Sequence, residues 1–371
     1  MGVKNLRIST IMDNTNVAQI FVESNSNHLQ QIYCGFEYLR RNGVLSLRQI
    51  IDKESSIFKK SRQLPTGVQS GYLKVIINED HKIVYDVHDG DGIDMELLDW
   101  CDRYNKRSFS LSKHANLSPK IKPLGLNYLV SPDGFSALSF ARSWALTSDV
   151  KSKLKNLLRE VDVKHLYSYR PTTTDLHYRP KLSENPRVLF LCRLWDPSDD
   201  DHFSLTKKQA EDRLEINHNR IECIRKLKDV FRDSFVGGLA ATPYAVKEFP
   251  EIVFSDQKMT SKRKYLSYLK TFDICVATTG LSNSIGWKLG EYIAMSKSIV
   301  TEPLHADLPG DIQANKNYLE FSDSESCVEV VGKLIEDKKF RLQMMVSNFE
   351  YYKNFLRPDK LVLNSVFDYL K

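Results

Sequence analysis

The sequence predicts an α/β protein of two domains, the second of which is built on a doubly wound parallel sheet. The chain has 371 residues, which is more than one ordinary hydrophobic core of about 100–200 residues accommodates. Its second half alternates short, continuous apolar runs with amphipathic helical segments, the pattern of parallel strands buried on both faces. Residues 167–186 carry three prolines and three consecutive threonines without an apolar period, which indicates an interdomain linker.

The composition is that of an ordinary globular protein, with 42% hydrophobic and 27% charged residues. No apolar run approaches the roughly 18 residues that a membrane span needs. No apolar signal region follows the N-terminal charges. The six cysteines are scattered and form no C-x-x-C pair, which predicts buried thiols in a reducing compartment rather than disulfides or a zinc site. We therefore expect a cytoplasmic protein.

The net charge of +6 is a mild excess. It suits phosphate-bearing ligands or an anionic lipid surface, and it equally fits a slightly basic protein with no such partner. No basic region is interleaved with stacking aromatic residues, so nucleic acid is not an expected partner.

The first half contains fewer clear periodic segments than the second. A strand is expected near its start, followed by a polar stretch with several asparagines and a helix that ends at Gly43. Two further strands are separated by a short polar turn, which favours a hairpin. The expected strands are residues 6–12, 72–77, 82–87 and 126–130, and the expected helices are residues 29–41 and 136–146.

The second half gives the clearest pattern. Its strands are short continuous apolar runs, and its first long helix carries an apolar stripe that should end before Gly237 and Gly238. The expected strands are residues 188–192, 272–277 and 298–301. The expected helices are the one containing Ile221 to Phe231, residues 285–295, 327–335 and 339–352, and a closing helix over 361–371.

Ligands of such sheets bind at the carboxyl ends of the strands. This rule selects residues 193–197 and the Gly- and Ser-rich residues 278–286, which run directly into a helix. Backbone N–H groups and the positive end of the helix dipole would hold a diphosphate there. Arg193 would add a planar, permanently charged fork for phosphate oxygens. The predicted donor contacts in the loop are Gly280, Ser282, Asn283 and Ser284.

Lys288 and Glu291 lie on the helix that follows this loop. Lys288 would place a second cation in the first turn, and the Glu291 carboxylate would accept hydrogen bonds from ribose hydroxyls. Two simpler interpretations stay open, namely an exposed Lys–Glu pair at i, i+3 and an ordinary helix N-cap formed by Ser284.

Residues 284–300, SIGWKLGEYIAMSKSIV, resemble the signature of group 1-type glycosyltransferases of the GT-B fold, which include bacterial surface-glycan enzymes. The resemblance covers about residues 186–335. It implies that Glu291 matches the second Glu of the Glu-x7-Glu pattern, while the first falls at Asn283. It also implies that Arg193 matches a basic residue that contacts the donor diphosphate.

The resemblance implies two Rossmann-like domains facing across a cleft. Residues 1–180 would bind the acceptor and residues 181–371 the nucleotide-sugar donor, with the last helix crossing back to the first domain. The implied activity is sugar transfer to a hydroxyl of a glycan, lipid-linked or protein-linked acceptor. No metal and no other cofactor is expected, and the protein would act in the cytoplasm, with or without peripheral contact at the inner face of the membrane.

An acceptor hydroxyl loses its proton as it attacks, so the first domain should supply a base at the cleft. Candidates are polar residues at strand ends: Asp89, His88 and Asp13. Asp89 is the preferred base because it follows an apolar strand and precedes Gly90, which permits a sharp turn. A polar turn without catalytic function is the alternative, since Asp-Gly pairs are strong turn formers.

Two other functions remain open at this point. Asp89 and Asp91 would form an Asp-x-Asp site for a divalent cation if the protein were a metal-dependent glycosyltransferase of a different fold. The missing first Glu is compatible with a nucleotide- or glycan-binding module that lacks catalysis. A Rossmann-type dehydrogenase is disfavoured, because no G-x-G-x-x-G opens a helix after a strand.

Overall fold

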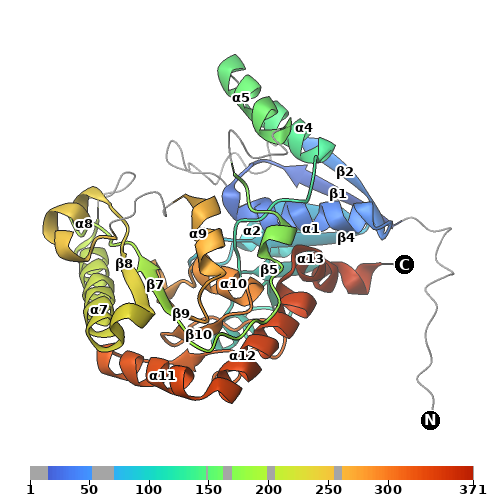
Figure 1. Cartoon of the computed structure of the whole chain (residues 1–371). Coiled ribbons are helices and arrows are strands. Elements are labelled where there is room, and N and C mark those ends of the chain that lie inside the picture. The colour runs from blue at the N-terminus through green and yellow to red at the C-terminus, as the bar shows by residue number, and fades with distance from the viewer. Residues whose placement is uncertain are drawn as a thin grey trace, which may run out of the picture.

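The computed structural model describes residues 16–51, 71–147, 149–161, 169–198, 205–254 and 261–370. Two β-sheets with flanking helices form the two halves of the molecule (Figure 1). Cavities lined by both halves lie between them. The prediction of an α/β fold with two Rossmann-like domains facing across a cleft is confirmed. No helix within the described ranges is both long and apolar enough to cross a membrane.

The first sheet has the strand order β2-β1-β3-β4-β5-β6. Its strands are β1 (Asn16–Val22), β2 (Leu45–Ile51), β3 (Tyr72–Ile77), β4 (His81–Asp86), β5 (Arg103–Lys106) and β6 (Ile121–Pro123). β3 runs antiparallel to β1 and β4, and the remaining neighbours pair in parallel. The carboxyl ends of β1, β4 and β5 therefore share one edge of the sheet.

Among the helices of this half, α1 is central to the core of the sheet. These helices are α1 (Gln30–Arg41), α2 (Met95–Trp100), α3 (Leu111–His114), α4 (Ala137–Leu146), α5 (Val150–Val161) and α6 (Thr173–Leu176). α1 forms where the apolar spacing predicts a helix, and it ends before Gly43, whose φ of 71° permits the left-handed turn. Ile32, Phe36 and Leu39 of α1 are buried against the sheet.

The second sheet is entirely parallel, with the order β11-β10-β9-β7-β8. Its strands are β7 (Val188–Cys192), β8 (Phe235–Leu239), β9 (Ile274–Ala277), β10 (Ser298–Thr301) and β11 (Leu319–Glu320). Numbered within this half the order is 2-1-3-4-5, so the winding reverses between β7 and β9. This reversal is the switch point at which doubly wound sheets bind ligands.

The helices of the second half cover both faces of this sheet and then return to the first half. They are α7 (Lys207–Phe231), α8 (Pro243–Glu248), α9 (Lys262–Leu269), α10 (Trp287–Ala294), α11 (Ser324–Glu336), α12 (Lys338–Tyr351) and α13 (Pro358–Val366). α13 packs on α1, where Leu361, Val362 and Val366 enter the core of the first sheet. Gly35 permits this approach, because a Cβ there would lie 2.3 Å from the Pro358 carbonyl oxygen.

Three expectations of local structure need correction or comment. Residues 126–130 form no strand. Every second side chain here, Leu126, Tyr128 and Val130, is buried between the halves, in one core cluster with residues of β9 and α10. α7 ends at Phe231, before Gly237 and Gly238 as expected, but these glycines lie inside β8. The strand expected over residues 6–12 lies outside the described residues, and β1 begins in the stretch interpreted as polar.

Candidate functional site

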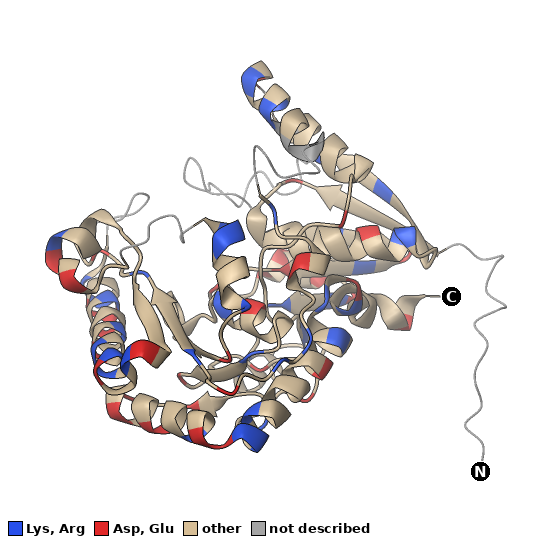
Figure 2. Cartoon of the chain, viewed as in Figure 1, with Lys and Arg blue, Asp and Glu red and all other residues tan. Residues whose placement is uncertain are grey.

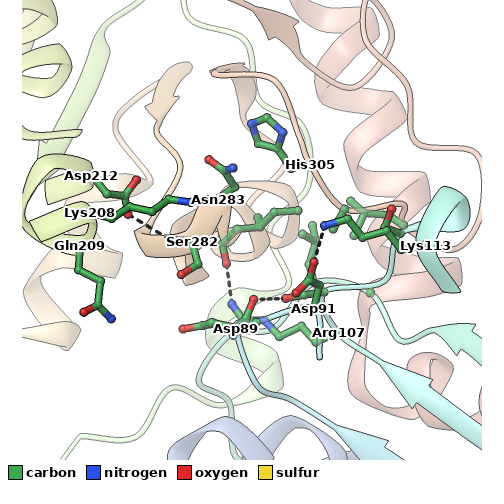
Figure 3. A pocket seen from close by; sticks show the side chains of 18 of the residues that line it. Asp89, Asp91, Arg107, Lys113, Lys208, Gln209, Asp212, Ser282, Asn283 and His305 are labelled. Carbon is green, nitrogen blue, oxygen red and sulfur yellow. Dashed lines mark hydrogen bonds and ion pairs between the residues drawn. The ribbon is translucent and has the colours of Figure 1, made fainter. Parts of the chain in front are cut away.

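Two adjoining cavities lie between the halves. The smaller has a volume of about 490 Å³ and is lined at the carboxyl ends of β7 and β9. The larger has a volume of about 710 Å³ and extends towards the N-terminus of α7 (Figure 3). Asp89, Arg107 and Ile285 line both cavities, so the two cavities adjoin at these residues.

The loop after β9 is a closed turn. Thr279 and Ile285 form an antiparallel bridge, and the N–H of Gly280 donates to the Ser284 carbonyl at 2.7 Å. Ser282 and Asn283 have φ values of 55° and 57°, which turn the chain back on itself. The predicted donor residues divide between the cavities: Gly280 and Ser284 line the smaller, and Ser282 and Asn283 line the larger.

α10 begins two residues later than the sequence predicts. Gly286 is its N-cap and makes no side-chain capping bond, so Ser284 is not the cap. The first backbone N–H groups of a helix have no partner within the helix, and here no side chain supplies one at the cap. Trp287, Lys288 and Leu289 line the smaller cavity. The positive end of the α10 dipole therefore faces this space.

Arg193 and Trp195 form the opposite wall, directly after β7. The Arg193 guanidinium lies 3.7 Å from the centroid of the Trp195 ring, and both side chains line the smaller cavity. The backbone of Trp195 is fixed by Asn217 of α7, which accepts from its N–H and donates to its carbonyl. The exposed Arg193 side chain thus packs on the ring of a tryptophan whose backbone is fixed by Asn217.

Arg220 joins the two loops and was not a sequence-predicted site residue. From α7 its buried guanidinium donates to the carbonyls of Arg193 at 2.6 Å and Thr279 at 2.8 Å. It thereby sets the spacing between the loop after β7 and the loop after β9. Only the fold reveals this role, because the sequence does not indicate which arginine of a long helix faces the strand ends.

Lys288 places a desolvated ammonium beside the smaller cavity. It donates to the Leu191 carbonyl, and burial lowers its pKa to about 8. Its first-turn position agrees with the predicted second cation, but it is not paired with Glu291 in an exposed i, i+3 bridge. The described contacts give the ammonium a backbone carbonyl as its hydrogen-bond partner.

Glu291 is buried and forms an ion pair with Lys262 of α9. Its second carboxylate oxygen, Oε2, is buried without a hydrogen-bond partner in the described part of the chain. The described walls of the smaller cavity include Lys288 and Leu289 but not Glu291. The Glu291 carboxylate thus lies behind the described wall of the smaller cavity. Its contact with a ribose stays a prediction.

At the edge of the first sheet, a buried carboxylate organises the end of β4. Asp86 accepts from Tyr104 at 2.7 Å and Lys106 at 2.9 Å, and its other oxygen lies 2.8 Å from Nδ1 of His88. Burial alone would raise the pKa of Asp86, but the hydrogen bonds and charges of His88 and Lys106 outweigh it and lower that pKa. His88 is packed against Tyr72, and the described walls of both cavities omit it.

Asp89 is the sequence-predicted residue that the structure brings to the junction of the cavities. It is half exposed and forms an ion pair with Arg107, which is buried. Arg107 also donates to the carbonyl of Ile285 at 2.5 Å and so connects the end of β5 with the loop before α10. A carboxylate of one half and a loop of the other are thus held by one guanidinium.

His28 was missed by the sequence reasoning. It follows β1 at the start of the α1 region, lines the smaller cavity and contacts the Trp287 ring at a centroid distance of 4.8 Å. Its Nδ1 is buried and has no hydrogen-bond partner among the described residues. Burial lowers the pKa of His28, the Arg107 charge lowers it further, and the Asp89 charge acts in the opposite direction. Burial and the Arg107 charge thus both favour the neutral form of the His28 imidazole.

Asp91 lines the larger cavity together with Asp89, but the two carboxylates have different cation partners. Asp91 pairs with Lys113, whose hydrogen bond lowers the Asp91 pKa, while Asp89 pairs with Arg107. In the described ranges, no group of three or more His, Cys, Asp or Glu side chains is arranged to hold a metal ion. Asp13 lies outside the described residues.

No protein-family model and no curated protein matches the sequence. Among solved structures, the chain is similar to HepE of Anabaena in complex with UDP, with 9% identity, a TM-score of 0.38, and coverage of 94% of this chain and 98% of that one. A glycosyltransferase from Rickettsia africae matches with 13% identity, a TM-score of 0.36, and coverage of 72% and 62%. The C-terminal domain of a group 1 glycosyltransferase (LpcC) from Francisella tularensis matches with 16% identity, a TM-score of 0.32, and coverage of 49% and 95%. Likenesses at these scores assign no activity to this chain.

Proposed function

We propose that this protein transfers a sugar from a nucleotide-sugar donor to a hydroxyl group of a glycan or glycoconjugate acceptor. The observation that carries the proposal is the smaller cavity at the switch point of the second sheet. Arg193, Lys288 and the uncapped N-terminus of α10 converge there. Two cations and a helix dipole are suited to a diphosphate, the anionic leaving group of such a donor.

The remaining walls suit the other parts of a nucleotide-sugar. Trp195 lines the same cavity and its ring packs against Arg193, so the base would lie against the Arg193–Trp195 pair. The ribose contact predicted for Glu291 would require its carboxylate, whose Oε2 is buried behind the described wall, to turn towards the cavity. The sugar would then lie towards Asp89 and Arg107, where the smaller cavity meets the larger one.

The larger cavity suits a polyhydroxylated acceptor. Lys208, Gln209 and Asp212 of α7 and Asn283 of the loop line it, and these side chains can donate to or accept from sugar hydroxyls. The acceptor oxygen would attack the anomeric carbon as the bond from that carbon to the diphosphate breaks. His28 would take the hydroxyl proton, and the Asp89 charge would stabilise the imidazolium that forms. Arg193, Lys288 and the α10 dipole would stabilise the departing diphosphate.

The donor assignment is tested by replacing Arg193 with alanine. Loss of a charge-assisted contact at an exposed position should weaken binding of UDP, GDP or CDP by about 1–2 kcal/mol, measured by isothermal titration calorimetry. Arg187→Ala is the matched control, because Arg187 precedes β7 and contacts Tyr268 and Phe272 at the opposite end of the strand. The assignment would be contradicted if both variants bound the nucleotide with equal affinity. It would also be contradicted if neither variant bound any nucleoside diphosphate.

Activity should not require a divalent cation. Asp89 and Asp91 each have a cation of their own, so neither carboxylate is offered to a metal shared with the diphosphate. Donor consumption in excess EDTA should therefore equal that in Mg²⁺ or Mn²⁺. Abolition by EDTA with recovery on adding Mn²⁺ would favour the Asp-x-Asp alternative, while nucleotide binding without any transfer would favour a non-catalytic module.

A further inference from the structure

Two residues form the neck of the closed turn after β9. Thr279 and Ile285 pair as an antiparallel bridge, and the turn from Gly280 to Ser284 lies between them. Ile285 immediately precedes Gly286, the N-cap of α10. The neck therefore connects the carboxyl end of β9 with the helix N-terminus at which the proposed diphosphate would bind. A shift of Thr279 would be passed to α10 through Ile285.

Glu302, which directly follows β10, binds this neck. One oxygen of its carboxylate, Oε2, accepts from the Thr279 N–H at 2.6 Å and from the Thr279 hydroxyl at 2.7 Å. Hydrogen bonds to an ionised carboxylate are shorter and about twice as strong as those between neutral groups. Two of them on one residue fix both its backbone and its side chain.

Arg220 of α7 binds the same threonine. α7 carries basic and acidic residues along its length (Figure 2), and the Arg220 guanidinium is buried. It donates to the Thr279 carbonyl at 2.8 Å and to the Thr278 hydroxyl at 3.0 Å. The N–H, hydroxyl and carbonyl groups of Thr279 are thus all bound by charged side chains, which come from two elements far apart in the sequence.

Glu302 stands where its charge is unfavourable for the proposed ligand. Its hydrogen-bond partner Thr279 and its sequence neighbour Thr301 both line the smaller cavity. A carboxylate beside that cavity repels a diphosphate, and it also occupies the Thr279 N–H, which the ligand then cannot use. This placement is explained if the carboxylate fixes the neck, because binding the two donors of Thr279 requires an acceptor.

We propose that Glu302 is a positioning residue of the donor site, which holds the neck so that the first backbone N–H groups of α10 face the diphosphate. The inference rests on the proposed function, because it presupposes a diphosphate at α10. The described walls of both cavities do not include Glu302, so it acts through Thr279. A displacement of about 1 Å in such a site can cost about a hundredfold in rate.

The test compares two substitutions of Glu302 that both remove the charge and differ in whether an acceptor remains. Glu302→Ala leaves no acceptor, so affinity for UDP, GDP or CDP should fall by about tenfold or more, measured by isothermal titration calorimetry. Glu302→Gln keeps an oxygen that can accept from Thr279 and lacks the charge that repels the ligand. Its affinity should therefore equal or exceed that of the wild type. A loss in Glu302→Gln as large as that in Glu302→Ala overturns the proposal.

Two further variants examine the same contact. Thr279→Val keeps the branched shape but lacks the hydroxyl. It should weaken nucleotide binding by about threefold alone and have no further effect in Glu302→Ala, where the contact is already lost. If Glu302→Ala does not fold, Glu302→Asp replaces it. Aspartate keeps the charge but is one methylene shorter, so it should bind nucleotide more weakly than Glu302→Gln, and equal or tighter binding overturns the proposal.

Asp273→Ala is the matched control. Asp273 is a buried carboxylate of the same half that accepts from the Ser183 N–H at 2.9 Å, but it precedes β9 at the amino end of the strand. This variant should lower the melting temperature without changing nucleotide affinity, which is the result that a purely structural role predicts for Glu302→Ala. Unchanged affinity in Glu302→Ala overturns this inference alone. Absence of nucleotide binding by the wild type overturns the proposed function together with it.

Discussion

Replacing His28 with glutamine is expected to lower turnover by about a hundredfold or more, because general base catalysis typically contributes that much. Glutamine keeps a polar side chain in the smaller cavity but cannot take up a proton. Nucleoside diphosphate affinity should stay within about twofold of the wild type, since His28 carries no positive charge for the diphosphate and glutamine is also neutral and polar. His218→Gln, on the exposed side of α7, is the matched control and should leave turnover unchanged.

The pH dependence of turnover distinguishes His28 from Asp89 as the base. Burial and the Arg107 charge lower the His28 pKa, so wild-type turnover should be constant near pH 7 and fall below the usual imidazole range as the base is protonated. Because the Asp89 charge raises that pKa, Asp89→Asn should move the fall to lower pH and reduce turnover less than His28→Gln does. Glutamine at position 28 should remove this fall altogether.

The opposite ranking would restore the sequence-based assignment. If Asp89→Asn loses about a hundredfold while His28→Gln is nearly as active as the wild type, Asp89 is the base. If both variants turn over normally, the acceptor proton leaves with the diphosphate, and neither residue is catalytic.

The second half could be predicted from the sequence because its strands are buried on both faces. Val188–Cys192 is a continuous apolar run, and the Gly- and Ser-rich loop that begins at Thr278 follows another such run. The order strand, loop, helix therefore located the loops at the switch point without knowledge of tertiary contacts. That order could not show that the Glu291 side chain points into the protein. Its direction is set by an ion pair with Lys262, which belongs to another helix.

The first half was harder because one face of its strands is not fully buried. β1 alternates buried with half-buried side chains and includes Asn16 and Gln19, so its sequence resembles a polar stretch. Without β1, nothing indicated that His28 stands at a strand end. Arg107 likewise follows a four-residue strand, too short to be recognised from periodicity. Both residues owe their importance to the way the halves meet.

Lys288→Met is expected to weaken binding of nucleoside diphosphates by about tenfold to a hundredfold while making the unliganded protein more stable. The loss of affinity follows from removing a desolvated cation that would contact the diphosphate. The gain in stability follows from the lowered pKa of about 8, against an ordinary lysine value near 10.4. Burial disfavours the charged ammonium, and methionine fills similar space without a charge.

The sign of the pH dependence follows from proton linkage. Between about pH 8 and the ordinary lysine pKa, the unfolded chain binds more protons at this position than the folded chain does, so the folded state gains stability as pH rises. Below about pH 8 the full penalty of the buried ammonium is present. The melting temperature of Lys288→Met should therefore exceed that of the wild type at pH 7, and the difference should shrink towards pH 10.

Lys297→Met separates a ligand-binding lysine from a merely buried one. Lys297 is also buried with a lowered pKa, and it donates to the Phe272 carbonyl at 2.6 Å. However, it precedes β10, at the amino end of the strand, where no ligand is expected. Its substitution should change the melting temperature but leave nucleotide affinity within about twofold of the wild type.

Nucleotide affinity as a function of pH completes the test of Lys288. Wild-type affinity should decline as pH rises through about 8, because the free protein loses the ammonium proton that an anionic ligand needs. Lys288→Met should bind weakly at every pH in this range and show no such decline, while Lys297→Met should follow the wild type. If Lys288→Met instead lowers the melting temperature and leaves affinity unchanged, this lysine stabilises the fold through its hydrogen bond to Leu191. The diphosphate site must then lie elsewhere.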